Sequence, residues 1–167
     1  MSQASEFDPY ALFAALDRER ASYVVIGGLA RVIHGSAETT DGVDITPSLR
    51  EENLRRLARA LDELDAGEQS VREQLASSDP VTVRTRAGEL RIVPVPWGTR
   101  GYDDLRIRAF RENLGRGLRP QVASIVDCVR MLEASHRRPD AQRLLRLRRL
   151  MELERRLAPH RRLTIER

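Results

Sequence analysis

The sequence predicts an α+β fold in which helices pack against a small mixed β-sheet, with a helical segment at the C-terminus. Segments with helix and strand periodicity alternate over residues 9–64. Two more strand-like segments, 81–85 and 90–95, are joined by a short link that contains a glycine, which is typical of an antiparallel hairpin. We expect a core with its N-terminal helix over residues 1–120, and C-terminal helices packed on that core over 121–167.

The first elements have clear boundary signals. Asp8 followed by Pro9 predicts a helix start, because aspartate caps free N–H groups of the first turn and proline needs no N–H there. The apolar run Tyr23–Ile26 predicts a strand covered on both faces. Gly27-Gly28 ends that strand and opens a helix over 29–34. The apolar face of the first helix is formed by Leu12, Phe13 and Leu16.

The next two elements are predicted from alternation and from a capping pattern. The segment Val43-Asp44-Ile45 predicts a half-buried strand whose apolar side chains face the core, while Asp44, with Gly42 and Thr46, faces the other way. Ser48–Glu51 matches a capping box and predicts a helix start. The apolar residues of that helix recur at helical spacing: Leu54, Leu57, Ala58, Leu61 and Leu64.

The second half of the chain alternates polar links with helical segments. Its expected elements are, in order, a polar loop with one helical turn (67–80), the hairpin, an irregular segment (96–101), a short helix capped by Asp103 (104–110), a helix capped by Ser124 that ends near Ser135, and a last helix from Pro139-Asp140 to about Leu157.

Composition limits the class of protein. The sequence is 41% hydrophobic and 32% charged, which favours a buried core and a hydrated surface. No apolar run approaches the roughly 20 residues that a membrane span needs, and the N-terminus has no signal-peptide pattern. Cys128 is the only cysteine, so no internal disulfide forms, and we expect a cytoplasmic protein. The three histidines lie far apart, which excludes a zinc motif.

Positive charge is concentrated at the C-terminus. All 29 basic residues are arginines, and residues 137–167 carry 11 of them against four acids, a net charge of +7. The interpretation stays open between a site for a polyanion or acidic partner and a solvated helix. Two apolar stripes on the last helix predict burial from two sides, by the core and by a homodimer or partner protein. Four arginines share a face that could contact RNA or DNA phosphates: Arg143, Arg146, Arg149 and Arg156.

The segment 23–47 contains the candidate site. A glycine turn that opens a helix presents N–H groups to phosphate oxygens, and carboxylates on a neighbouring strand are ligands for Mg²⁺. The order Gly27-Gly28, Arg31, Thr40, Asp44 resembles the nucleotidyltransferase fold, the family of DNA polymerase β and the minimal nucleotidyltransferases. Further segments resemble the abortive-infection and toxin–antitoxin branch of that family: Thr85–Leu90, Gly101–Leu105, Val122–Ser124 and Arg138–Asp140.

The resemblance implies a nucleotidyltransferase fold, and it implies Mg²⁺ and a nucleoside triphosphate as cofactors of an active member. An active member would transfer a nucleoside monophosphate to RNA or to a protein hydroxyl. Nucleotides, RNA or tRNA, and a cognate antitoxin are the implied partners. Asp44 would bind the metal, and the phosphate-binding residues would be Gly27, Gly28, Arg31, Ser36 and Arg91.

Several positions depart from the family pattern T-x-D-h-D, where h is apolar. Gly42 stands where the first metal ligand belongs, and Arg91 stands where a third acid belongs. Met131 and Leu132 replace a serine–lysine pair of the later helix. These departures predict a degenerate member, a pseudoenzyme with weak or no transferase activity that binds a nucleotide, a nucleic acid or a partner.

Two arrangements of the charged residues remain open. A bulge at Gly42 would turn Asp41 toward Asp44, and Glu89 would complete a set of catalytic acids with Asp41 and Asp44 as metal ligands. Alternatively, Arg91 pairs with Asp44 and replaces the charge of the metal. The second arrangement would leave a phosphate pocket without metal chemistry.

Overall fold

The computed structural model describes residues 6–66, 71–75, 77–135 and 140–161. Within these ranges, six strands form one sheet in the order β3-β4-β2-β1-β6-β5. The strands are β1 (Tyr23–Ile26), β2 (Gly42–Pro47), β3 (Val81–Thr85), β4 (Gly88–Ile92), β5 (Phe110–Arg111) and β6 (Gln121–Val122). The helices are α1 (Pro9–Arg18), α2 (Gly27–Ile33), α3 (Glu51–Glu63), α4 (Val71–Leu75), α5 (Tyr102–Leu105), α6 (Ile125–Ser135) and α7 (Asp140–Arg161).

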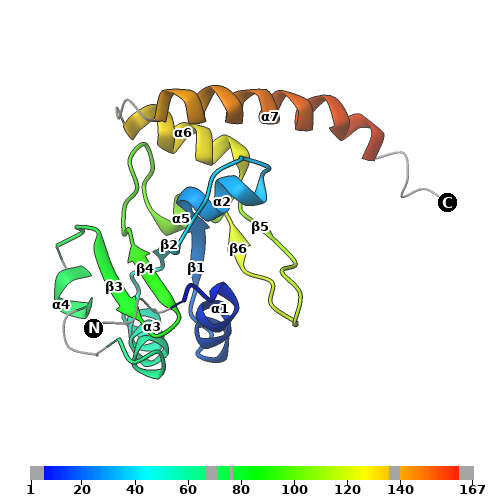
Figure 1. The fold of residues 1–167 in the computed structure, drawn as a ribbon. Helices are drawn as coiled ribbons and strands as arrows, with labels where there is room; N and C mark the ends of the chain where they lie inside the picture. Colours follow the sequence, from blue (N-terminus) through cyan, green and yellow to red (C-terminus); the bar gives the residue numbers. More distant parts are fainter. Residues whose placement is uncertain (1–5, 67–70, 76, 136–139, 162–167) are drawn as a thin grey trace.

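The sheet is mixed, which confirms the predicted α+β class. β1 pairs antiparallel with β2 and parallel with β6, while β2 pairs parallel with β4. β3 and β4 form the predicted antiparallel hairpin. In Figure 1 the strands lie between α1, α3 and α4 at one end of the view and α2, α6 and α7 at the other. The two central strands, β1 and β2, are therefore the elements that connect these helix groups.

The N-terminal elements follow their sequence signals closely. Asp8 accepts a hydrogen bond from the backbone N–H of Ala11 at 3.1 Å and caps α1, as predicted. All four residues of β1 are buried, as its continuous apolar run predicted. The predicted apolar face of α1 belongs to the main core cluster, in which Leu12, Phe13 and Leu16 are at most 1% exposed. Burial of this size is the main stabilising contribution to the fold.

The last helix packs on the core along one apolar stripe and at Leu150 of the other. Leu147 is fully buried, and Leu144 and Met151 pack partly against the core. On the second stripe, Leu153 and Leu157 are 53% and 58% exposed. Figure 1 shows the C-terminal half of α7 extending past the rest of the fold. None of the described helices is long and apolar enough to cross a membrane.

The capping box predicted at Ser48 is wrong. α3 begins at Glu51 with Arg50 as its N-cap, and no side chain caps it. β2 runs through Pro47, and Ser48 N–H then bonds the carbonyl of Ser22 at 3.0 Å, so Ser48 belongs to the end of the strand. The side chain of Asn53 holds this junction by donating to the carbonyl oxygens of both serines. Ser48 is buried there, and its hydroxyl accepts from the N–H of Arg50 at 3.5 Å rather than from the first turn of the helix.

The segment around residue 103 also differs from its prediction. α5 begins at Tyr102, directly after Gly101, and ends at Leu105, so Asp103 is not its cap. Phe110, expected in this helix, lies in β5 and pairs with Val122 of β6. β5 and β6 were not predicted, because two-residue strands carry too little periodicity to be recognised. Their pairing ends the helix early.

The hairpin differs from its prediction in one strand. β4 begins two residues before the expected position, at Gly88, because the turn contains only Arg86 and Ala87. Thr85 closes this turn by donating from its hydroxyl to the Gly88 carbonyl at 2.7 Å. β3 has its predicted bounds, and its buried and exposed residues alternate. The shift of β4 sets which residues lie beside Asp44.

Candidate functional site

The candidate site lies on β2, between β1 and β4. In the sheet register, Asp44 is opposite Ile26 on one side and Arg91 on the other. A cavity of about 210 Å³ opens there. Its lining contains seven of the predicted residues and four that were not predicted: Gly28, Arg31, Asp41, Asp44, Glu89, Arg91 and Arg143, with Glu38, Thr39, Thr40 and Gly42.

Gly27 is in direct contact with Asp44. It has φ +67°, a conformation that residues with a side chain rarely adopt. A Cβ atom placed on Gly27 would lie 2.4 Å from Oδ2 of Asp44. The turn after β1 and the carboxylate on β2 are therefore packed against each other, as the predicted site requires.

The Asp44 carboxylate occupies a partly buried position. Burial raises the pKa of Asp44 above its ordinary value, while the guanidinium groups of Arg91 and Arg31 act in the opposite direction and Glu89 adds to the rise. None of the described residues donates a hydrogen bond to this carboxylate or forms an ion pair with it within 4 Å. Arg91 on the adjacent strand attracts Asp44 electrostatically. The close Arg91–Asp44 ion pair, which was the second predicted arrangement, does not form.

Gly42 occupies the position where the first metal ligand was expected, and its surroundings exclude a larger side chain. It lies opposite Glu89 in the ladder between β2 and β4. A Cβ atom on Gly42 would lie 2.8 Å from the backbone oxygen of Glu89. The register from Gly42 to Ile45 is uninterrupted, so the bulge that would turn Asp41 toward Asp44 does not form. This local packing of the two strands has no room for a side chain at position 42.

The acids of the cavity do not gather into a metal centre. Asp41 and Glu89 are exposed, while Asp44 is half-buried. Across the parts of the chain that the structure describes, no group of three or more histidine, cysteine, aspartate or glutamate residues is placed to hold a metal ion. Two-metal chemistry needs carboxylates that bridge two ions about 4 Å apart, and Asp44 is the carboxylate best placed to be one.

Glu38 is a cavity residue that the sequence reasoning missed. Arg31 donates two hydrogen bonds to it, at 2.9 and 3.0 Å, and the Ser36 hydroxyl donates a third at 2.8 Å. Burial opposes the charge of Glu38, but the bonds from Arg31 and Ser36 outweigh it and lower its pKa. Arg143 of α7 approaches Glu38 to 3.9 Å. The loop between α2 and β2 creates this cluster, and no motif in the sequence marks it.

The predicted arginines of α7 divide into two groups. Arg146 joins Arg143 in a second cavity that adjoins the first and is also lined by Ser36 and Glu38. Arg156 instead pairs with Glu152 at 3.1 Å, and Arg149 is exposed elsewhere on the helix. Only the N-terminal part of α7 therefore reaches the candidate site.

Compared with models of protein families and with curated protein sequences, the chain gives no match.

Proposed function

We propose that this chain is a nucleotidyltransferase-like protein of the toxin–antitoxin type with a degenerate metal site and weak or no transferase activity. It binds a nucleotide through the cavity beside Asp44. The observation that carries the proposal is the contact between Gly27 and Asp44, with Arg91 opposite Asp44 on the adjacent strand. This is the arrangement of a phosphate-binding turn and a carboxylate, with a cation where a third acid would stand.

The charges of the cavity support binding rather than catalysis. A triphosphate close to the Asp44 carboxylate needs positive charge between them. Arg91 supplies a fixed positive charge on the neighbouring strand, whereas Arg31 is held by Glu38. A guanidinium binds phosphate oxygens through its paired N–H groups, but it cannot polarise an attacking oxygen as two Mg²⁺ ions do.

Calorimetric titration with ATP, GTP, CTP and UTP tests the proposal, with and without EDTA. At least one triphosphate is expected to bind in EDTA, and Arg91→Ala is expected to weaken that binding about tenfold or more, ~1.4 kcal/mol. Arg55→Ala is the matched control, because Arg55 pairs with Glu51 on the exposed side of α3. Absence of binding for all four triphosphates at about 1 mM, a concentration that detects even weak sites, would refute the proposal.

The alternative is an active Mg²⁺-dependent transferase that moves a nucleoside monophosphate from a triphosphate to RNA or to a protein hydroxyl. It is favoured by the shared cavity of Asp41, Asp44 and Glu89, and by the Asp44 carboxylate that none of the described residues engages. Incorporation of label from radioactive triphosphates into total RNA and protein measures this activity. It must require Mg²⁺ and disappear in Asp44→Ala.

The partner of the proposed protein is RNA or tRNA, or a protein such as a cognate antitoxin or a second copy. Arg143 and Arg146 support a nucleic acid, because they line the cavities on the α7 side. The exposed Leu153 and Leu157 support a protein partner. Filter binding with tRNA over a salt series distinguishes them, since phosphate contacts weaken steeply with salt, while light scattering measures self-association.

A further inference from the structure

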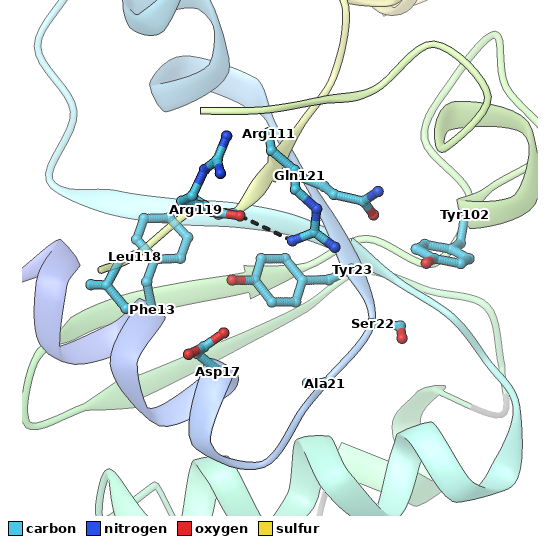
Figure 2. A pocket seen from close by; sticks show the side chains of 11 residues that line it. Phe13, Asp17, Ala21, Ser22, Tyr23, Tyr102, Arg111, Leu118, Arg119 and Gln121 are labelled. Atoms are coloured by element: carbon cyan, nitrogen blue, oxygen red, sulfur yellow. Dashed lines mark hydrogen bonds between the residues drawn. The ribbon is translucent and has the colours of Figure 1, made fainter. Parts of the chain in front are cut away.

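A third cavity, of about 180 Å³, opens at the end of β1 opposite to the Asp44 cavity. Tyr23 begins this strand and Ile26, next to Asp44, ends it, so the two cavities are separated by roughly 10 Å along the strand. The wall combines aromatic, apolar and charged side chains and is drawn in Figure 2. The proposed function uses none of these residues.

Tyr23 supplies a hydroxyl to this cavity. Tyr23 as a whole is 8% exposed, and its ring stacks on Phe13 with 6.3 Å between the ring centroids. No residue in the described ranges forms a hydrogen bond with the hydroxyl. Burial raises the pKa of Tyr23, so the hydroxyl stays neutral and can donate a hydrogen bond at physiological pH.

Two opposite charges flank the Tyr23 ring. In Figure 2 the Arg111 guanidinium lies on one side of the ring and the Asp17 carboxylate on the other. The two groups act on Tyr23 with opposite sign, Asp17 raising its pKa and Arg111 lowering it. Neither forms an ion pair within 4 Å with any residue that the structure describes. The cavity therefore presents a positive and a negative group that do not neutralise each other.

Arg111 is held in place by the β5–β6 hairpin. Its Nη1 donates to the backbone oxygen of Arg119 at 3.2 Å, which leaves the other N–H groups of the guanidinium free to bind a ligand. The side chain of Arg119 itself points away from the Tyr23 ring in Figure 2. The Arg111 guanidinium is thus oriented at the cavity, and such a fork matches a carboxylate.

We infer that this cavity binds a small zwitterion, a free α-amino acid, with its carboxylate at Arg111 and its ammonium at Asp17. A simple anion would be repelled by Asp17, and a simple cation by Arg111. A zwitterion satisfies both charges, and its carboxylate can also accept from the Tyr23 hydroxyl. The walls formed by Phe13, Tyr102 and Leu118 would contact its side chain.

The charge pattern is tested with matched ligands. Glycine, L-leucine and L-phenylalanine are titrated into the full chain by NMR, beside 3-phenylpropanoate, which carries only the carboxylate, and 2-phenylethylamine, which carries only the ammonium. At least one amino acid is expected to bind. L-phenylalanine, if it is that ligand, binds about tenfold or more tightly than either single-charge analogue, as expected for two charge-assisted contacts. For glycine, the matched single-charge analogues are acetate and methylamine. For L-leucine, they are 4-methylpentanoate and isoamylamine.

Variants assign the two charges. Arg111→Gln is expected to abolish the preference for the amino acid over the ammonium analogue, and Asp17→Asn the preference over the carboxylate analogue. Arg119→Gln is the control at the neighbouring arginine, because its guanidinium points away, and Arg91→Ala is the control at the other cavity. Thermal unfolding of each variant verifies that it folds. Failure of all three amino acids to bind at about 1 mM, or equal binding of either single-charge analogue, would overturn the inference, whatever the outcome of the triphosphate titration.

Discussion

Oδ2 of Asp44 lies 2.4 Å from the point that a Cβ atom on Gly27 would occupy. The glycine at the end of β1 is therefore required by its neighbour on β2 as well as by its own backbone, which has φ +67°. This double requirement ties the turn to the carboxylate.

Replacing Gly27 by alanine should destabilise the protein by about 1–3 kcal/mol, from the left-handed backbone and from the steric overlap with Asp44. Gly28→Ala is the matched control, because a Cβ there meets nothing closer than 3.5 Å. Urea denaturation of the two variants measures the difference. The loss in Gly27→Ala should shrink when Asp44 is also replaced by glycine. Equal stability of the two single variants would contradict the packing described here.

Gly42→Asp would restore the family's motif in sequence but not in structure. The new Cβ would lie 2.8 Å from the backbone oxygen of Glu89, so β2 and β4 would have to separate. We expect a loss of about 1–3 kcal/mol, the range of an overpacked position, and no gain of Mg²⁺-dependent transferase activity. Denaturation and label incorporation measure the two effects. A stable variant with new activity would show that the strands adapt readily.

The raised pKa of Asp44 predicts a pH-dependent stability. Because the folded state binds the proton of Asp44 more tightly than the unfolded state, this group favours folding below its unfolded pKa of about 3.9. That contribution is lost as the pH rises through the higher folded pKa. Asp44→Asn should therefore match the wild type in acid and exceed it in stability near pH 7. Denaturation at pH 3–7 tests this, with the exposed Asp41→Asn as control.

Arg31 and Glu38 should behave as one unit. Their side chains are 13% and 12% exposed, so removing one partner leaves the other charged and poorly hydrated. Glu38→Gln is expected to destabilise the protein by about 1–3 kcal/mol at neutral pH. The double variant Arg31→Met/Glu38→Leu is expected to lose less stability than the sum of its own single variants, Arg31→Met and Glu38→Leu. Because the pKa of Glu38 is lowered, the cost should vanish as the pH falls through that folded pKa. A double-mutant cycle gives the coupling, and the exposed Arg55–Glu51 pair should give at most about 0.5 kcal/mol.

Local signals in the sequence were sufficient for most elements of the fold. Asp8-Pro9, the apolar run of β1 and the alternation around Asp44 each determine a helix start or a strand through contacts within a few residues. They failed at Ser48, which follows the end of β2 and bonds to Ser22, and at Phe110, which pairs with Val122 of β6. In both places pairing between remote segments outweighs the local preference.

What the sequence determined by itself was the identity of the groups: a glycine turn, one strand carboxylate and an arginine in place of an acid. Which groups meet was decided only by the tertiary structure. Glu38 reaches Arg31 because the α2–β2 loop closes on the helix, and Asp17 faces Arg111 because α1 and the β5–β6 hairpin flank the same tyrosine. Such contacts join segments up to about a hundred residues apart, and their geometry depends on the packing of the whole chain rather than on any periodic pattern.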